Sequence, residues 1–115
     1  MRSDRKRLQD ILQAIEQIEH YTVQGKQAFE EDTLLQSGVL YQIVIIGEAS
    51  RVLGSALLTQ YPDIPWSSII GMWNIVVHQY FGVDLALVWS VVERNLPELK
   101  RMIEAILQKL GDERY

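Results

Sequence analysis

The stretch Thr33–Tyr61, TLLQSGVLYQIVIIGEASRVLGSALLTQY, decides the fold of this chain. From Val39 to Ile46 it is almost continuously apolar and rich in Ile and Val, a composition that favours a β-strand. Its length excludes that interpretation, because nearly thirty residues with only glycines as turn signals far exceed a strand. The apolar residues also recur at helical spacing, which predicts one long helix; they are Leu35, Val39, Ile43, Ile46, Leu53 and Leu57.

The predicted helix is apolar around much of its circumference. Such a helix must be covered on both sides, either by the rest of a bundle or by a second copy of the chain. Gly47 and Gly54 would allow a neighbouring helix to approach closely.

Three further segments complete the expected architecture. Residues 2–21 carry an amphipathic stripe of Leu and Ile, and residues 22–32 suit a bend with one or two helical turns. A last helix should begin at Asp84, an N-cap, and run to Leu110, with a kink or restart at Pro97 where Asn95 and Glu98 have capping-box spacing. We therefore predict a single all-α domain over residues 1–115, an up-and-down bundle of four to five helices.

Composition limits the possible functions. The 115 residues contain 48% hydrophobic and 23% charged side chains and no cysteine, so we expect a folded cytoplasmic protein without disulfides or thiolate sites. The longest near-apolar run is far shorter than the ~20 residues of a membrane span. The formal charge of −4 also argues against coating nucleic acid by bulk electrostatics, so any RNA contact should be local.

The stretch Ser67–Asp84 carries the chemically distinctive residues. If it is helical, Asn74 and His78 lie at i and i+4 on one face, and Tyr80 lies in the last turn beside them. Histidine titrates near neutrality, so His78 could accept a proton from a ribose 2′-OH or donate one to a leaving oxygen. Neither a metal cluster nor a glycine-rich phosphate loop accompanies it in the sequence, and we expect no metal and no cofactor.

The motif Asn74-x-x-x-His78-x-Tyr80-Phe-Gly-Val-Asp84 closely resembles the signature of the HepT-like branch of the HEPN superfamily. The resemblance extends from about Leu34 to Leu110, and it includes Pro65-Trp66, Ile46-Gly-Glu-Ala49 and Leu96-Pro-x-Leu99. One position departs from the family pattern, which is arginine, four residues, histidine, one residue, tyrosine. The arginine position here is Trp73.

The resemblance implies a helical homodimer that acts as a metal-independent endoribonuclease toxin of a type VII toxin–antitoxin system. It implies that His78 is catalytic with Asn74 beside it, and that Tyr80 receives AMP from a cognate MntA-type minimal nucleotidyltransferase, the antitoxin. Attached AMP would place negative charge beside His78 and obstruct RNA. A phenol has a pKa near 10, so the base that activates Tyr80 would have to come from that partner.

Trp73 leaves two functions open. A hydrogen-bond donor placed on the phosphate typically raises the cleavage rate by about 10²–10³. Trp73 can supply neither charge nor a bidentate contact to a phosphate, although it could stack on a base. Asn74 could donate a hydrogen bond but no charge. The chain is therefore either an active toxin ribonuclease or a catalytically attenuated HEPN partner that presents Tyr80 or a nucleotide to the nucleotidyltransferase.

Two charged groups have both a structural and a functional interpretation. Glu48 and Arg51, at i and i+3, are either an exposed intrahelical ion pair or a support in which Glu48 faces the His78 helix. The basic residues at positions 2, 5, 6 and 7 are either a solvated helix end, which we favour, or a phosphate-contacting patch.

Overall fold

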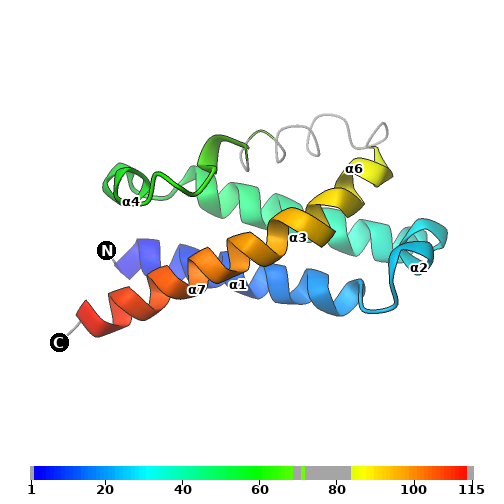
Figure 1. The fold of residues 1–115 in the computed structure, drawn as a ribbon, viewed down its shortest axis with the longest axis horizontal. Helices are drawn as coiled ribbons and strands as arrows, with labels where there is room; N and C mark the ends of the chain where they lie inside the picture. The colour runs from blue at the N-terminus through cyan, green and yellow to red at the C-terminus, as the bar shows by residue number, and fades with distance from the viewer. Residues whose placement is uncertain (1, 69–70, 72–83, 114–115) are drawn as a thin grey trace.

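The computed structural model describes residues 2–68, 71 and 84–113 (Figure 1). Its helices are α1 Arg2–Tyr21, α2 Lys26–Glu31, α3 Thr33–Arg51, α4 Ser55–Gln60, α6 Leu85–Ser90, the π-helix η2 Val91–Asn95 and α7 Leu96–Glu113. Within this described part of the chain there is no strand. The predicted all-α bundle is confirmed.

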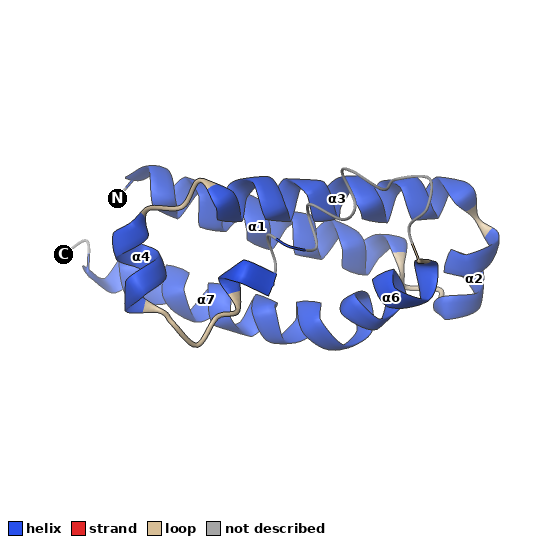
Figure 2. Cartoon of the chain, turned by 90° about the horizontal axis from the view of Figure 1, so that it is seen from above, coloured by secondary structure: helices blue, strands red, loops and turns tan. Residues whose placement is uncertain are grey.

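The three long helices, α1, α3 and α7, form the body of an elongated bundle. Helix α1 packs against both α3 and α7. The two termini and α4 lie at the same end of the bundle, and α2 lies at the other (Figures 1 and 2).

The amphipathic stripe of α1 supplies the centre of the core. Its Leu8, Ile11 and Ile15 are fully buried, because they face apolar residues of α3 on one side and of α7 on the other. The α3 contribution includes Val39 and Ile46, and the α7 contribution includes Leu99, Ile103 and Ile106. The predicted first helix is therefore confirmed, as is a short helix, α2, within residues 22–32.

The predicted single helix over Thr33–Tyr61 is wrong, because the chain breaks between α3 and α4. Helix α3 ends at Arg51, and Gly54 is the N-cap of α4 with an extended backbone. The backbone N–H of Gly54 donates to Oδ1 of Asp4 at 2.9 Å, and the Asp4 side chain is almost completely buried. Gly54 thus allows the close approach of a neighbouring helix, as expected, and the group that approaches is the Asp4 carboxylate of α1.

The predicted interruption at Pro97 takes the form of a π-turn. The backbone remains helical through η2, and Leu96 N–H donates to the carbonyl of Val91, five residues earlier. Pro97 has no N–H to donate, and the wider turn accommodates its ring. Asn95 lies inside this helical run, so the capping box with Glu98 is not formed.

The segment before α6 is capped as the sequence predicts. Oδ1 of Asp84 accepts hydrogen bonds from the backbone N–H groups of Ala86 and Leu87 at 2.9 and 3.3 Å. The last helix runs beyond Leu110 to Glu113. No helix in the described ranges is long and apolar enough to cross a lipid bilayer.

Candidate active site

The predicted catalytic and modification residues fall outside the described part of the chain. Trp73, Asn74, His78 and Tyr80 all lie in residues 72–83. Their roles stay predictions. The structure instead describes the elements that hold the two ends of this motif segment.

The chain that leads into the motif is fixed by Trp66. This side chain is 8% exposed, and its indole Nε1–H donates to the backbone carbonyl of Tyr61 at 3.2 Å. The Trp66 backbone N–H donates to the carbonyl of Ile64, which is also buried. The Pro65-Trp66 pair that contributes to the family resemblance thus closes a compact turn between α4 and the motif.

The chain that leaves the motif is fixed by Asp84. Its carboxylate satisfies two of the N–H groups at the start of α6 that have no partner within the helix. Val88 of α6 is buried in the core, and Leu87 remains 47% exposed. Both ends of the motif segment are therefore anchored to the bundle by specific contacts.

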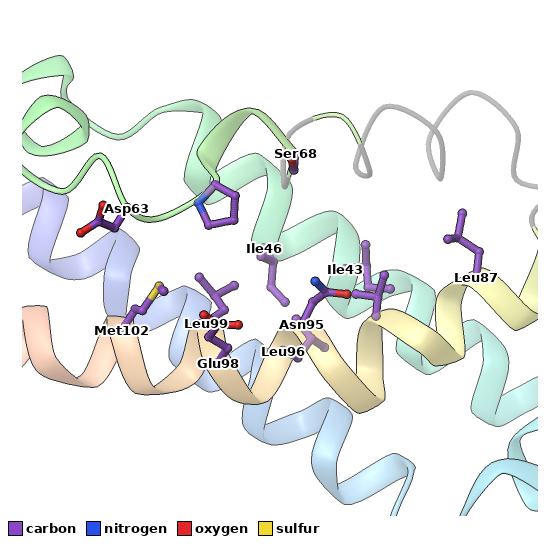
Figure 3. Close-up of a pocket in the computed structure, with 12 residues that line it drawn as sticks. Ile43, Ile46, Asp63, Ser68, Leu87, Asn95, Leu96, Glu98, Leu99 and Met102 are labelled. Carbon is purple, nitrogen blue, oxygen red and sulfur yellow. The ribbon is translucent and has the colours of Figure 1, made fainter.

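A cavity of about 400 Å³ lies between these two anchors. Its apolar walls include Ile43 and Ile46 of α3 and, facing them, Leu96 and Leu99 of α7 (Figure 3). Asp63, Ser68, Asn95 and Glu98 supply the polar groups among its described lining residues. Ser68 and Leu87, which also line the cavity, lie shortly before and after the motif segment in the sequence.

Glu48 and Arg51 form the ion pair that one of the two interpretations predicts. Oε1 of Glu48 and Nη2 of Arg51 are 2.5 Å apart, and both side chains are about half exposed. An exposed intrahelical pair contributes only a few tenths of a kcal/mol to stability. A second role for Glu48 towards His78 is untested, since His78 lies outside the described residues.

The remaining histidine is His20. It is exposed in the last turn of α1, with its ring centroid 6.3 Å from that of Tyr21. In the part of the chain that the structure describes, no three His, Asp or Glu side chains gather as a metal-binding group.

Sequence reasoning did not identify the polar residues of the cavity. Asn95 was interpreted as a helix cap, whereas its side chain faces the cavity from η2. The available signal was its spacing: Val91, Asn95 and Met102 lie at i, i+4 and i+11, and all three line the cavity. Asp63 was assigned only to a turn, and its position at the cavity depends on tertiary structure.

An all-α bundle with a His78–Tyr80 motif between α4 and α6 defines a HEPN-type protein. Within that class the chain belongs to the HepT-like ribonuclease family: the family model described as Ribonuclease HepT-like matches residues 11–106. No solved structure matches the chain.

Similar proteins carry ribonuclease names. "Probable ribonuclease HepT" of Thermococcus cleftensis is 36% identical over 108 residues, which cover 91% of this chain and 96% of that protein. "Putative RNase MJ1380" of Methanocaldococcus jannaschii is 31% identical over 100 residues, which cover 86% of this chain and 92% of that protein. A third relative from the same archaeon, "Gamma-glutamylcyclotransferase and putative RNase MJ0434", is 42% identical over 115 residues; the match covers 96% of this chain and 50% of the relative.

Proposed function

We propose that this chain is the toxin of a type VII toxin–antitoxin pair, a metal-independent endoribonuclease that acts on cytoplasmic RNA as a homodimer. The observation that carries the proposal is the motif Asn74-x-x-x-His78-x-Tyr80 in a chain of the HepT-like ribonuclease family. His78 takes the proton of a ribose 2′-OH, or protonates the leaving 5′-oxygen, and Asn74 donates a hydrogen bond nearby.

Neutralisation in this proposal occurs at Tyr80. A minimal nucleotidyltransferase of the MntA type transfers AMP from ATP to the phenol oxygen, forming a phosphodiester and releasing pyrophosphate. The added phosphate lies two residues from His78 in sequence, where its charge repels the RNA backbone. The expected test is transfer of labelled AMP to the wild-type chain and no transfer to Tyr80→Phe.

A second function is favoured by Trp73. The family arginine would hold a positive charge against the RNA phosphate while negative charge develops there in the transition state. Tryptophan has no charge and cannot do so. The alternative is an attenuated HEPN protein that binds the nucleotidyltransferase and presents Tyr80 to it. AMP transfer would occur under both proposals, so RNA cleavage is the measurement that separates them.

The decisive experiment measures cleavage of a structured RNA in EDTA by the wild type, His78→Ala and Trp73→Arg. Cleavage by the wild type that is lost in His78→Ala supports the ribonuclease. Cleavage by Trp73→Arg alone supports the attenuated partner, because restoring the charge would restore about 10²–10³ in rate. Cleavage that persists in His78→Ala, or absence of cleavage in all three, overturns the assignment of His78.

A further inference from the structure

The cavity between α3 and α7 has the size and the lining of a small-molecule site. Its volume of about 400 Å³ lies in the range of ligand pockets, which is about 300–1,000 Å³. Ile43 and Ile46 of α3 form one apolar wall. Leu96 and Leu99 of α7 face them across the cavity (Figure 3). Two opposed apolar walls suit a flat ring, because the faces of such a ring offer no hydrogen-bonding groups.

The polar groups of the lining determine which part of a ligand enters. Asp63 and Glu98 carry carboxylates, and no lysine or arginine accompanies them among the described lining residues. An ionised carboxylate accepts hydrogen bonds and donates none, and two of them repel a phosphate. The charge of the cavity therefore favours an uncharged ring with N–H donors. In RNA that ring is a base, and the phosphate would stay outside.

We propose that the cavity holds a guanine base of the RNA substrate. Guanine presents two adjacent donors, N1–H and the N2 amino group, which match the two oxygens of one carboxylate. The amino groups of adenine and cytosine lie beside acceptor nitrogens, and the N–H of uracil lies between two carbonyls. On each of these three bases a carboxylate would meet one donor and a repelling acceptor. The inference rests on the proposed function, in which RNA is the substrate.

Glu98 and Asn95 are placed to bind this edge of guanine together. They lie three positions apart on one continuous helical run, where side chains at that spacing are neighbours. Both line the cavity and both are exposed, which places them at its mouth. Glu98 accepts hydrogen bonds from N1–H and the N2 amino group, and the Asn95 amide donates one to O6.

Met102 provides a reporter of binding, because it also lines the cavity. The chain has three methionines, so the isotope-labelled methyl signal of Met102 in NMR is identified by its loss in Met102→Leu. We expect guanosine monophosphate (GMP) to bind at least about tenfold more tightly than inosine monophosphate (IMP), which lacks only the N2 amino group. Both nucleotides carry the same phosphate, so its repulsion cancels in the comparison. Equal binding of GMP and IMP, or no shift with either, overturns the proposal.

Substitution of Glu98 tests the carboxylate itself. Glu98→Gln keeps the size of the side chain and replaces one acceptor oxygen by a donor. We therefore expect it to weaken GMP binding at least about tenfold and to remove the preference over IMP. The matched control is Glu104→Gln, which changes an exposed glutamate of α7 outside the described cavity lining and should bind GMP as the wild type does. Circular dichroism checks that both variants are folded. A preference for GMP that survives in Glu98→Gln overturns the assignment.

Competition with RNA distinguishes a base of the substrate from a free guanine nucleotide. A short single-stranded RNA with one guanosine should displace GMP from His78→Ala, and the same RNA with inosine at that position should do so at least about tenfold less well. Failure of the RNA to displace GMP would assign the cavity to a free nucleotide and overturn its role with RNA. None of these measurements requires cleavage. A chain that prefers guanosine but cuts no RNA would therefore refute the proposed ribonuclease and support the guanine site.

Discussion

The carboxylate of Asp4, in the first turn of α1, accepts a hydrogen bond from the backbone N–H of Gly54, fifty residues later, at 2.9 Å. The contact connects the start of the chain to the N-cap of α4. It therefore helps to fix the direction in which the chain leaves α3 and approaches Trp66 and the motif.

Asp4→Ala should destabilise the fold by about 1–3 kcal/mol, because it leaves the Gly54 N–H without its partner in a partly buried place. The free energy of unfolding in urea is the measurement. Asp10→Ala is the matched control on the same helix: Asp10 forms an exposed pair with Lys6, and its loss should cost less than about 0.5 kcal/mol. Equal costs for the two variants would contradict a specific role for Asp4.

Gly54→Ala should destabilise for a steric reason. The backbone of Gly54 is in the extended region that any residue adopts, but an added Cβ would lie 2.9 Å from Oδ2 of Asp4. We therefore expect the cost of Gly54→Ala to fall in an Asp4→Ala background, since the clashing oxygens are then gone. A double-mutant cycle on unfolding free energies measures this coupling. Additive costs would show that the two residues act independently.

Local signals in the sequence predicted much of this fold, and tertiary contacts explain where they failed. The stripe of α1 and the Asp84 cap depend on residues a few positions apart, and both are confirmed. The break before α4 was missed, because the partner of Gly54 lies far away in the sequence, on α1. Nothing in the composition of Thr33–Tyr61 specifies that contact.

The candidate site was likewise predictable only in part. The motif centred on His78 was recognised from residue identities, and its geometry lies outside the described residues. The walls of the cavity come mainly from α3, η2 and α7, and α3 is distant from the other two in sequence, so the polar lining was not predicted. The π-turn was accessible in principle: buried Val91 and Leu96 are five residues apart, a spacing that a regular α-helix does not place on one face.

Pro97→Ala should change the free energy of unfolding by less than about 1 kcal/mol. Removing a proline from a regular helix interior is worth about 3 kcal/mol. Here the π-turn already accommodates the ring, and it should persist without the proline, because Val91 and Leu96 must both face the core. Urea unfolding measures the change. A gain near 3 kcal/mol would mean that the proline itself imposes the turn.

The Lys100–Glu19 pair between α7 and α1 should stabilise the fold only while the lysine is protonated. Nζ of Lys100 is 2.9 Å from Oε1 of Glu19, and this hydrogen bond raises the pKa of Lys100 above its ordinary 10.5. Because the pKa of Lys100 is higher in the folded state, the pair contributes fully to stability at pH values below the pKa of the unfolded chain. The contribution is lost as the pH rises through the pKa of the folded state. Lys100→Met should thus cost under about 1 kcal/mol at pH 7 and nothing well above pH 10.5. Unfolding at both pH values tests this, with Arg101→Met, an exposed neighbour, as the control.

Glu48→Gln and Arg51→Gln should each change the free energy of unfolding by only a few tenths of a kcal/mol, because the two side chains pair on the exposed surface of α3. Urea unfolding of the two variants measures the change. A loss of more than about 1 kcal/mol in either variant would contradict a weak surface pair. Loss of RNA cleavage in Glu48→Gln with unchanged stability would instead favour the second interpretation, in which Glu48 orients His78.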